Sequence, residues 1–236
     1  MKKVIIIRYA EMYLKGKNRG FFERVFSTNI ERALKGIRHE LRRYSGRYLV
    51  EGFDGADADE IVGRLKKVFG IHSMSIALET SNDLKSIFEA AKAVSRSSGT
   101  FKVESHRADK RYPLTSMEIS REVGGMLLSQ FPALTVDVHN PSFYVYVDIR
   151  ENGTALVFGE FFPGADGMPV GTAGKGVLLI SGGIDSPVAG HMLAKRGMSV
   201  ECLHFHSYPY TNLQAKEKVI ELAKILSGYT LGKTLY

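Results

Sequence analysis

The sequence has little cysteine and no long apolar run. Its 236 residues include one cysteine and no tryptophan. A single cysteine excludes an internal disulfide framework and suits a reducing compartment. Near the start, only Val4 to Ile7 are apolar before Arg8, which is too short for the apolar region of a signal peptide. No stretch approaches the roughly eighteen apolar residues of a membrane-spanning helix. We therefore expect a soluble, cytoplasmic protein without a membrane partner.

Acidic residues are scarce at the N-terminal end of the chain. Residues 1–50 hold 13 Lys and Arg against 4 Asp and Glu, a local net charge of +9, whereas the whole chain carries +7. A concentrated positive field attracts phosphate backbones. An acidic membrane surface is the alternative, but the basic residues are interleaved with strand and helix signals instead of forming one polybasic tail. The charge pattern therefore favours a nucleic acid as the partner.

The first 78 residues show an alternation of strand and helix signals. Residues 4–7 predict a buried strand, and Asn18 is the expected N-cap of an amphipathic helix. Strand signals return over 38–50, a capping-box pattern at 57–60 opens a second helix, and 71–78 predict a further strand. The order β-α-β-α-β is typical of a small ferredoxin-like α+β domain.

A second α/β unit begins near Asp83, the expected cap of a helix. A capping box at 115–118 opens another helix, which we expect to extend to about residue 130. Asn152-Gly153 then separates the predicted strands 143–149 and 155–161. This dipeptide predicts a hairpin with a type I′ turn, in which both residues take positive φ.

The last part of the chain follows a glycine- and proline-rich stretch, 163–176, which we interpret as a linker. A strand, a helix, a strand and a helix are expected after it, at 177–180, 187–196, 199–205 and 213–226. Such alternation indicates a parallel, doubly wound sheet. Two strands are fewer than the about four to six usual in such sheets, so we expect this domain to be incomplete.

The most specific motif is Ser181-Gly182-Gly183-Ile184-Asp185-Ser186, directly after the predicted strand and before Pro187. Two glycines let backbone N–H groups approach phosphate oxygens, Ser186 is a suitable N-cap, and a helix N-terminus favours anions. The alternative is a glycine-rich turn without a ligand. A Walker A loop is excluded because Gly174-Lys175 is followed by Gly176, and a dinucleotide fingerprint is excluded because no third glycine has the required offset.

This strand-SGGIDS-P-helix pattern resembles the PP-loop of the ATP pyrophosphatases. Together with three other stretches it resembles the tRNA 4-thiouridine synthetases, also called tRNA sulfurtransferases: IIIRYAEMYLKGKNRGFF, FKVESHRADKRYPLTSMEISREVGG and HFHSYPY. The resemblance implies an α/β and α+β multidomain protein. Its expected parts are an N-terminal ferredoxin-like domain over 1–59, a THUMP RNA-binding domain over 60–165, and a partial doubly wound parallel-sheet PP-loop ATP-pyrophosphatase domain over 166–236.

The family resemblance also implies an activity, in which ATP adenylates O4 of a uridine near the tRNA acceptor end and sulfur replaces that oxygen to give 4-thiouridine. Implied cofactors are ATP and Mg²⁺, and implied partners are tRNA and a cysteine desulfurase or other persulfide sulfur donor. A homodimer is one of the oligomeric states allowed. The family also serves thiamine thiazole synthesis.

The family's persulfide-bearing cysteine lies beyond Tyr236, so the alternative is a non-catalytic tRNA-binding fragment. THUMP domains also occur on RNA methyltransferases, but the chain has neither a glycine-rich cofactor fingerprint nor an NPPY-like tetrapeptide.

Carried over residue by residue, the resemblance assigns Asp185 and Ser186 to catalysis and Asp185 to magnesium. It implies that ATP contacts the loop, the end of the preceding strand and the end of the following strand: Leu179, Ile180, Ser181, Gly182, Gly183, Asp185, Ser186, His204 and Phe205. The carboxyl ends of parallel strands are also where open α/β sheets place ligands. His204 and His206 could share a strand face as metal ligands, but no third ligand follows, and Cys202 reads as a small core residue.

Two basic segments are the expected tRNA contacts. Arg107, Lys110 and Arg111 lie in a polar stretch between a strand and a capped helix, where a loop can present cations to phosphates, although Glu104 and Asp109 make an ordinary surface loop the alternative. Lys15, Lys17 and Arg19 precede a helix N-terminus. Cations there oppose the helix dipole, so a phosphate partner explains them better than helix stability does.

Overall fold

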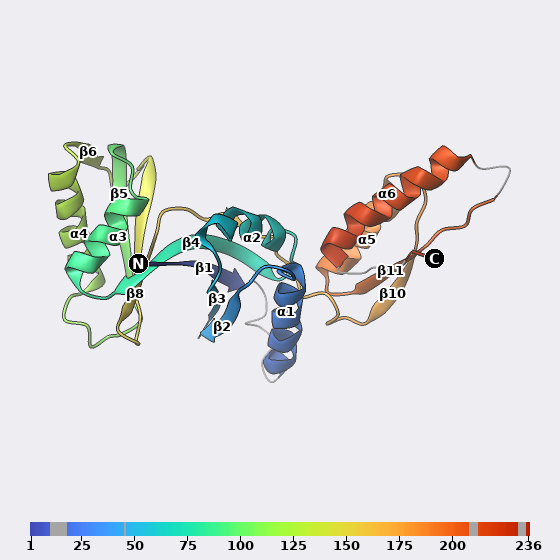
Figure 1. Ribbon diagram of the computed structural model, residues 1–236, viewed down its shortest axis with the longest axis horizontal. Helices are drawn as coiled ribbons and strands as arrows, with labels where there is room; N and C mark the ends of the chain where they lie inside the picture. The colour runs from blue at the N-terminus through green and yellow to red at the C-terminus, as the bar shows by residue number, and fades with distance from the viewer. Residues whose placement is uncertain (10–17, 45, 208–211, 231–234) are drawn as a thin grey trace. The chain divides into compact units, whose positions relative to one another are not determined.

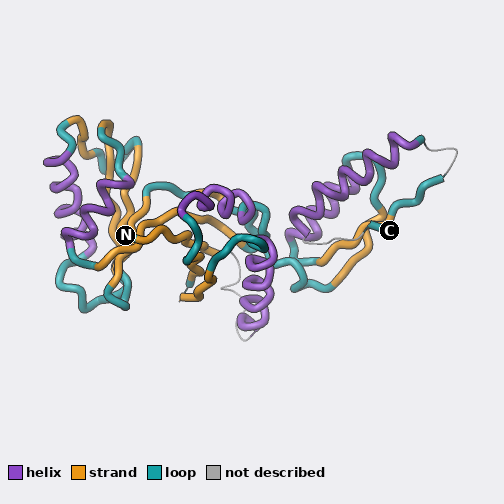
Figure 2. The backbone as a smooth tube through the Cα atoms, viewed as in Figure 1, coloured by secondary structure: helices purple, strands orange, loops and turns teal. Residues whose placement is uncertain are grey.

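The computed structural model of the chain describes residues 1–9, 18–44, 46–207, 212–230 and 235–236 (Figure 1). The fold divides into two units. One comprises residues 1–6, 49–55 and 75–161, and the other comprises residues 7–48, 56–74 and 162–236. Helices and strands alternate through both units (Figure 2), and no described helix is long and apolar enough to cross a membrane. The mixed α/β character predicted from the sequence is therefore confirmed.

The ferredoxin-like part contains four strands in the hydrogen-bonded order β2-β3-β1-β4. Its elements are β1 (Lys2–Tyr9), α1 (Arg19–Ala33), β2 (Glu40–Tyr44), β3 (Arg47–Glu51), α2 (Ala58–Leu65) and β4 (Ile71–Ser81). Buried apolar residues from Val4 to Ile7 make β1 a central strand of this sheet. The sequence predicted one strand over 38–50, and the structure has two neighbouring strands there, because the chain turns at Gly46 with a φ of 81°.

Two of the predicted N-cap residues in this part stand at the predicted positions but do not make a side-chain capping bond. Neither Asn18 nor Asp57 caps its helix through the side chain, because both residues have right-handed helical backbone angles instead of the extended angles of a capping residue. Glu60 pairs with Arg64 at 2.6 Å and does not complete a capping box. The expected domain boundary after residue 59 falls within α2, so the two sides of that boundary share one helix.

The middle part of the chain, residues 84–158, builds one core from two helices and the strands beside them. Its elements are α3 (Leu84–Val94), β5 (Ser98–Arg107), α4 (Ser116–Gln130), β6 (Ala133–Val136), β7 (Phe143–Ile149) and β8 (Thr154–Phe158). The strand order is β4-β8-β7-β5-β6; β5 is parallel to β6 and β7, and β7 is antiparallel to β8. Alternate strand residues such as Phe101, Val145 and Val157 pack with Ile87 and Ile119 from the helices.

The helix caps and the hairpin predicted for this middle part are mostly confirmed. Asp83 caps α3 by accepting from Ser86 N at 2.9 Å, and Thr115 and Glu118 form the predicted capping box of α4. The predicted hairpin joins β7 to β8. Its turn differs from type I′, because Gly153 has a φ of 78° while Asn152 does not take positive φ. The Asn152 side chain instead accepts from the hydroxyl of Thr154 at 2.8 Å.

The last part of the chain has two parallel strands, as predicted: β10 (Lys175–Leu179) and β11 (Ser199–Leu203), with α5 (Asp185–Lys195) and α6 (Leu213–Thr230). Ile180, Cys202, Val219 and Leu226 form its small core. Gly190 lets α5 pack closely, because a Cβ there would lie 2.7 Å from Leu178 Cδ2 and 2.8 Å from Leu226 Cδ2.

The linker predicted over 163–176 packs against its own unit. Its first residue ends β9 (Phe162–Pro163), which pairs with β4. Asn29 of α1 donates its side-chain amide to Val170 O at 3.0 Å, and Gly70 N donates to Asp166 O at 2.8 Å. Val170 is buried. These contacts fix the segment that leads into β10.

Candidate functional site

The glycine-rich loop connects the carboxyl end of β10 to the N-terminus of α5. Ile180 is buried at the base of the loop and donates its N–H to Leu203 O at 2.9 Å. Ser181, Gly183 and Asp185 are exposed. The backbone N–H groups of the first helical turn have no partners within the helix, so this junction can bind an anion.

Two hydroxyl groups hold the loop in shape. Ser181 N donates to Ser186 Oγ at 3.1 Å, and Gly183 N lies 3.4 Å from Ser181 Oγ. The prediction that Ser186 is the N-cap is wrong, because the helix begins at Asp185 and Ile184 is the capping residue without a side-chain bond. Ser186 closes the loop from inside the first turn, so its hydroxyl faces back toward Ser181.

The two loop glycines are not required by the packing of the protein itself. A Cβ on Gly182 would come no closer than 3.8 Å to Lys218 Cδ, and one on Gly183 no closer than 3.6 Å to Ser181 Oγ. Both distances are ordinary van der Waals contacts, and neither glycine has positive φ. The absence of side chains therefore leaves open space over the loop backbone, which is what close approach by a phosphate needs.

Lys218 is a candidate site residue that the sequence did not reveal. It lies on α6, is exposed, and its side chain approaches Gly182. Helical periodicity indicates only that this lysine is on a polar face; the packing of α6 over the β-α-β unit brings it to the loop. A cation at this position complements a bound phosphate.

His204 and Phe205 follow β11 at the same sheet edge as the loop. The register of the parallel pair aligns Leu179 with Leu203, so Ile180 and His204 leave the sheet side by side. His204 Nδ1 lies 3.0 Å from Ile180 O, and the Phe205 side chain is exposed. The structure thus brings His204 to the predicted loop and presents an aromatic ring beside it.

The alternatives of a metal site and a reactive thiol in this region gain no support. His204 and His206 lie beyond the end of β11, with ring centroids 6.4 Å apart. Across the described part of the chain, no three His, Cys, Asp or Glu side chains are grouped as metal ligands. Cys202 is buried in the small core, and burial raises the pKa of its thiol, so the prediction of a core residue is confirmed.

The first group of predicted tRNA contacts is only partly visible. Lys15 and Lys17 lie outside the described residues. Arg19 stands at the start of α1, where its guanidinium donates to Glu23 at 2.9 Å and to Tyr9 Oη at 2.7 Å. The Arg19 guanidinium is therefore hydrogen-bonded within its own domain, while its side chain stays partly exposed.

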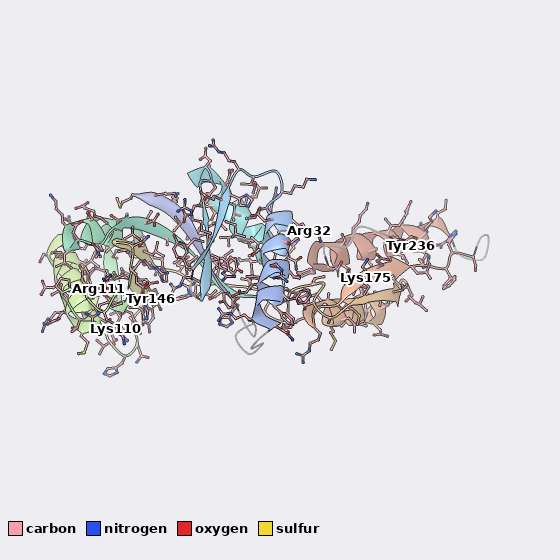
Figure 3. All side chains as sticks on the ribbon, turned by 90° about the horizontal axis from the view of Figure 1, so that it is seen from below. Arg32, Lys110, Arg111, Tyr146, Lys175 and Tyr236 are labelled. Atoms are coloured by element: carbon pink, nitrogen blue, oxygen red, sulfur yellow. The ribbon has the colours of Figure 1, made fainter. Side chains whose placement is uncertain are left out.

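The second group separates into one structural residue and two exposed cations. Arg107 Nη1 donates to Tyr112 O at 2.8 Å and to Leu114 O at 3.0 Å, which folds the loop between β5 and α4. Lys110 and Arg111, both labelled in Figure 3, are exposed on that loop. Asp109 pairs with Arg111 at 3.1 Å, and this hydrogen-bonded pairing raises the pKa of Arg111 and lowers the pKa of Asp109.

Comparison with known protein families gives three adjacent matches along the chain. Residues 4–75 match the ThiI ferredoxin-like domain, residues 81–158 match the THUMP domain, and residues 171–235 match the thiamine biosynthesis protein ThiI. The order is the one expected from the sequence motifs. The third match contains the glycine-rich loop, Lys218 and His204.

Individual relatives agree with these matches. A probable tRNA sulfurtransferase of Moorella thermoacetica is 46% identical over 96% of this chain, which covers 58% of the relative. One from Alkaliphilus metalliredigens is 48% identical over the whole chain, covering 61% of the relative. Among solved structures, a 4-thiouridine synthetase in complex with RNA and ATP is similar with a TM-score of 0.88 and 38% identity, over 100% of this chain and 61% of that protein. The chain thus spans about three fifths of the length of these relatives.

Proposed function

The chain belongs to the ThiI family of tRNA sulfurtransferases, and we propose that it binds tRNA and ATP in the conversion of a uridine near the tRNA acceptor end to 4-thiouridine. The observation that carries the proposal is the open SGGIDS loop between β10 and α5, on a chain whose middle part matches a THUMP domain. A similar protein has been solved with RNA and ATP bound. The open loop and the exposed cations are suited to those two ligands.

The loop would act on the phosphates of ATP. Its exposed backbone N–H groups and the first turn of α5 would bind pyrophosphate oxygens, with the Ser181 and Ser186 hydroxyls beside them. Attack by the uridine O4 on the α-phosphorus would break the bond to the β-phosphate oxygen and release pyrophosphate. The outer sulfur of a persulfide would then attack C4 and form a C–S bond as AMP leaves. A thiol would cleave the remaining S–S bond, which gives 4-thiouridine and a disulfide.

Asp185 and Ser186 offer hard oxygen donors that fit Mg²⁺. The Asp185 carboxylate is exposed in the first turn of α5, next to the Ser186 hydroxyl. Mg²⁺ is usually held by one or two carboxylates together with substrate phosphates, and it neutralises charge on those phosphates. Leu179, Ile180, His204 and Phe205 lie at the adjacent strand ends, where they would contact the nucleoside of ATP.

The sulfur donor, the oligomeric state and the compartment belong to the same proposal. A cysteine desulfurase or another persulfide carrier would supply sulfur, because the one cysteine of this chain is buried. A homodimer and a cytoplasmic location stay predictions. The alternative function is tRNA binding without catalysis, and it differs from the main proposal in having no ATP-dependent chemistry.

Replacing Lys218 by Ala tests the nucleotide site. We expect ATP to bind roughly three- to fivefold more weakly, since an exposed charge contact contributes modestly. Lys216→Ala is the matched control: this lysine is also exposed on α6, two residues away and therefore on a different helical face. Titration of ATP by calorimetry measures both variants. Equal affinities for the two variants would remove Lys218 from the site.

Replacing Lys110 and Arg111 by Ala tests whether the loop between β5 and α4 contacts tRNA. We expect about tenfold weaker tRNA binding at low salt and an unchanged Tm, because both side chains are exposed. Arg107→Ala should lower Tm by about 4 °C or more, since two loop carbonyls lose their donor. Filter binding and thermal melts separate the two cases. Wild-type tRNA affinity in the double variant would show that this loop is not a tRNA contact.

A further inference from the structure

A buried glutamate on α1 joins two arginines that are distant in sequence. Arg19 Nε donates to Glu23 Oε1 at 2.9 Å, and Arg43 Nη1 of β2 donates to Glu23 Oε2 at 2.7 Å. The Glu23 side chain is 6% exposed. Each carboxylate oxygen therefore has one charged donor, and the acid is fixed between the helix and the strand.

The two arginines differ in what they leave available. Arg19 also donates to Tyr9 Oη at 2.7 Å. The Arg43 side chain is 60% exposed, and among the described residues its guanidinium makes one hydrogen bond, from Nη1 to Glu23, which leaves Nε and Nη2 available to a ligand. One positive charge compensates the carboxylate, so the cluster of three keeps a net charge of about +1 at the surface.

A purely structural role for Glu23 would need only one of these two arginines. A single guanidinium can neutralise and hydrogen-bond a buried carboxylate in bidentate form, and a buried charge is stabilised once it is paired. Here a second guanidinium is held at the same acid with most of its fork exposed. Holding one donor edge restricts the side chain, which lowers the entropy that a ligand must offset when it orders the arginine.

From these contacts we infer that Arg43, positioned by Glu23, binds a backbone phosphate of RNA. The remaining N–H groups of the guanidinium fork match phosphate oxygens, and the cluster lies within the first fifty residues, whose net charge is +9. Arg19 then supports the clamp by sharing the acid. The inference rests on the proposed tRNA binding and adds to it a specific contact, with Glu23 as a positioning residue.

Arg42 is a matched control for Arg43. The two are neighbours on β2, and adjacent strand residues point to opposite faces. Arg42 donates to the exposed Glu40 on its own strand, at 3.1 Å and 3.3 Å. Both substitutions remove one positive charge from the same strand, so only a specific phosphate contact makes their effects differ.

The first test compares Arg43→Gln with Arg42→Gln in the 236-residue chain, by measuring tRNA affinity over a range of KCl concentrations. We expect Arg43→Gln to weaken binding about five- to tenfold at low salt and to reduce the slope of log K against log[KCl] by about 0.9, the value for one duplex phosphate. Arg42→Gln should stay within about twofold of the parent, with its slope unchanged. Equal effects of the two substitutions would overturn the inference.

The second test uses Glu23→Gln, for which charge and positioning predict opposite signs. The substitution raises the local net charge by one, so attraction by charge alone would tighten tRNA binding. If Glu23 positions Arg43, binding weakens about threefold or more despite the added charge. Tighter or unchanged binding by a folded Glu23→Gln protein contradicts positioning. Arg43→Lys keeps the charge but loses the fork, and we expect it to bind as weakly as Arg43→Gln.

The outcome also separates this inference from the function on which it rests. A parent chain that binds no tRNA at low salt overturns the proposed function and the clamp together. A parent chain that binds tRNA, with Arg43→Gln indistinguishable from Arg42→Gln, overturns only the phosphate contact proposed for Arg43. Melting curves of each variant establish that the comparison is made on folded protein. The comparison of Arg43→Gln with Arg42→Gln gives a result even if Glu23→Gln does not fold.

Discussion

Asp185→Asn is expected to weaken the binding of ATP at least about tenfold in the presence of Mg²⁺, with tRNA affinity unchanged. The carboxylate stands in the first turn of α5, exposed beside Ser186 and the glycine-rich loop. Mg²⁺ links such a carboxylate to phosphate oxygens, and an amide is a much weaker ligand for this ion. The tRNA contacts proposed on β2 and on the loop between β5 and α4 are on other elements, so they are not affected.

Without Mg²⁺ the same substitution should act in the opposite direction. A free carboxylate next to the loop repels the phosphates of ATP, and the amide does not. In EDTA we therefore expect Asp185→Asn to bind ATP more tightly than the parent. Calorimetric titrations with and without Mg²⁺ measure this change of sign.

Asp59→Asn is the control for this pair of titrations. Asp59 is an exposed acid in the first turn of α2, so it matches Asp185 in charge, exposure and position within a helix. Its substitution should leave both titrations unchanged. If Asp185→Asn weakens ATP binding equally with and without Mg²⁺, the carboxylate is not the metal contact, and the assignment of Asp185 is wrong.

The sequence predicted best those features that depend on a few neighbouring residues. Asp83 and Thr115 cap their helices because extended backbone angles place each side-chain oxygen near an N–H two or three residues later. Asn18 and Ser186 are residue types that also cap helices, yet neither does so here. The backbone conformation at a helix start is set by the entering chain, which the residue type alone does not specify.

The contacts that define the candidate sites are mostly long-range, which explains why the sequence did not show them. Glu23 and Arg43 are twenty residues apart, and Lys218 approaches Gly182, which lies thirty-six residues earlier in the chain. Their meeting depends on how helices pack on strands, whereas periodicity reveals only which face of an element is polar. The SGGIDS loop was predictable because its strand, glycines and helix are contiguous. The role of Arg107 was not, since a basic loop residue that binds phosphate and one that binds carbonyl groups of its own loop look alike in sequence.

The most direct measurement of the proposed function is the formation of 4-thiouridine. The 236-residue chain can be joined to the part of the Moorella thermoacetica relative that it does not cover, since the two are 46% identical over the shared region. The fusion is incubated with tRNA, MgATP and a persulfide donor, and digested tRNA is examined by mass spectrometry, with the intact relative as the reference. We expect 4-thiouridine from the fusion and at least about 100-fold less from its Asp185→Asn variant, because charge on the departing pyrophosphate loses its metal. A fusion that binds tRNA and ATP as the relative does, yet forms no 4-thiouridine while the relative forms it, would contradict the proposed function.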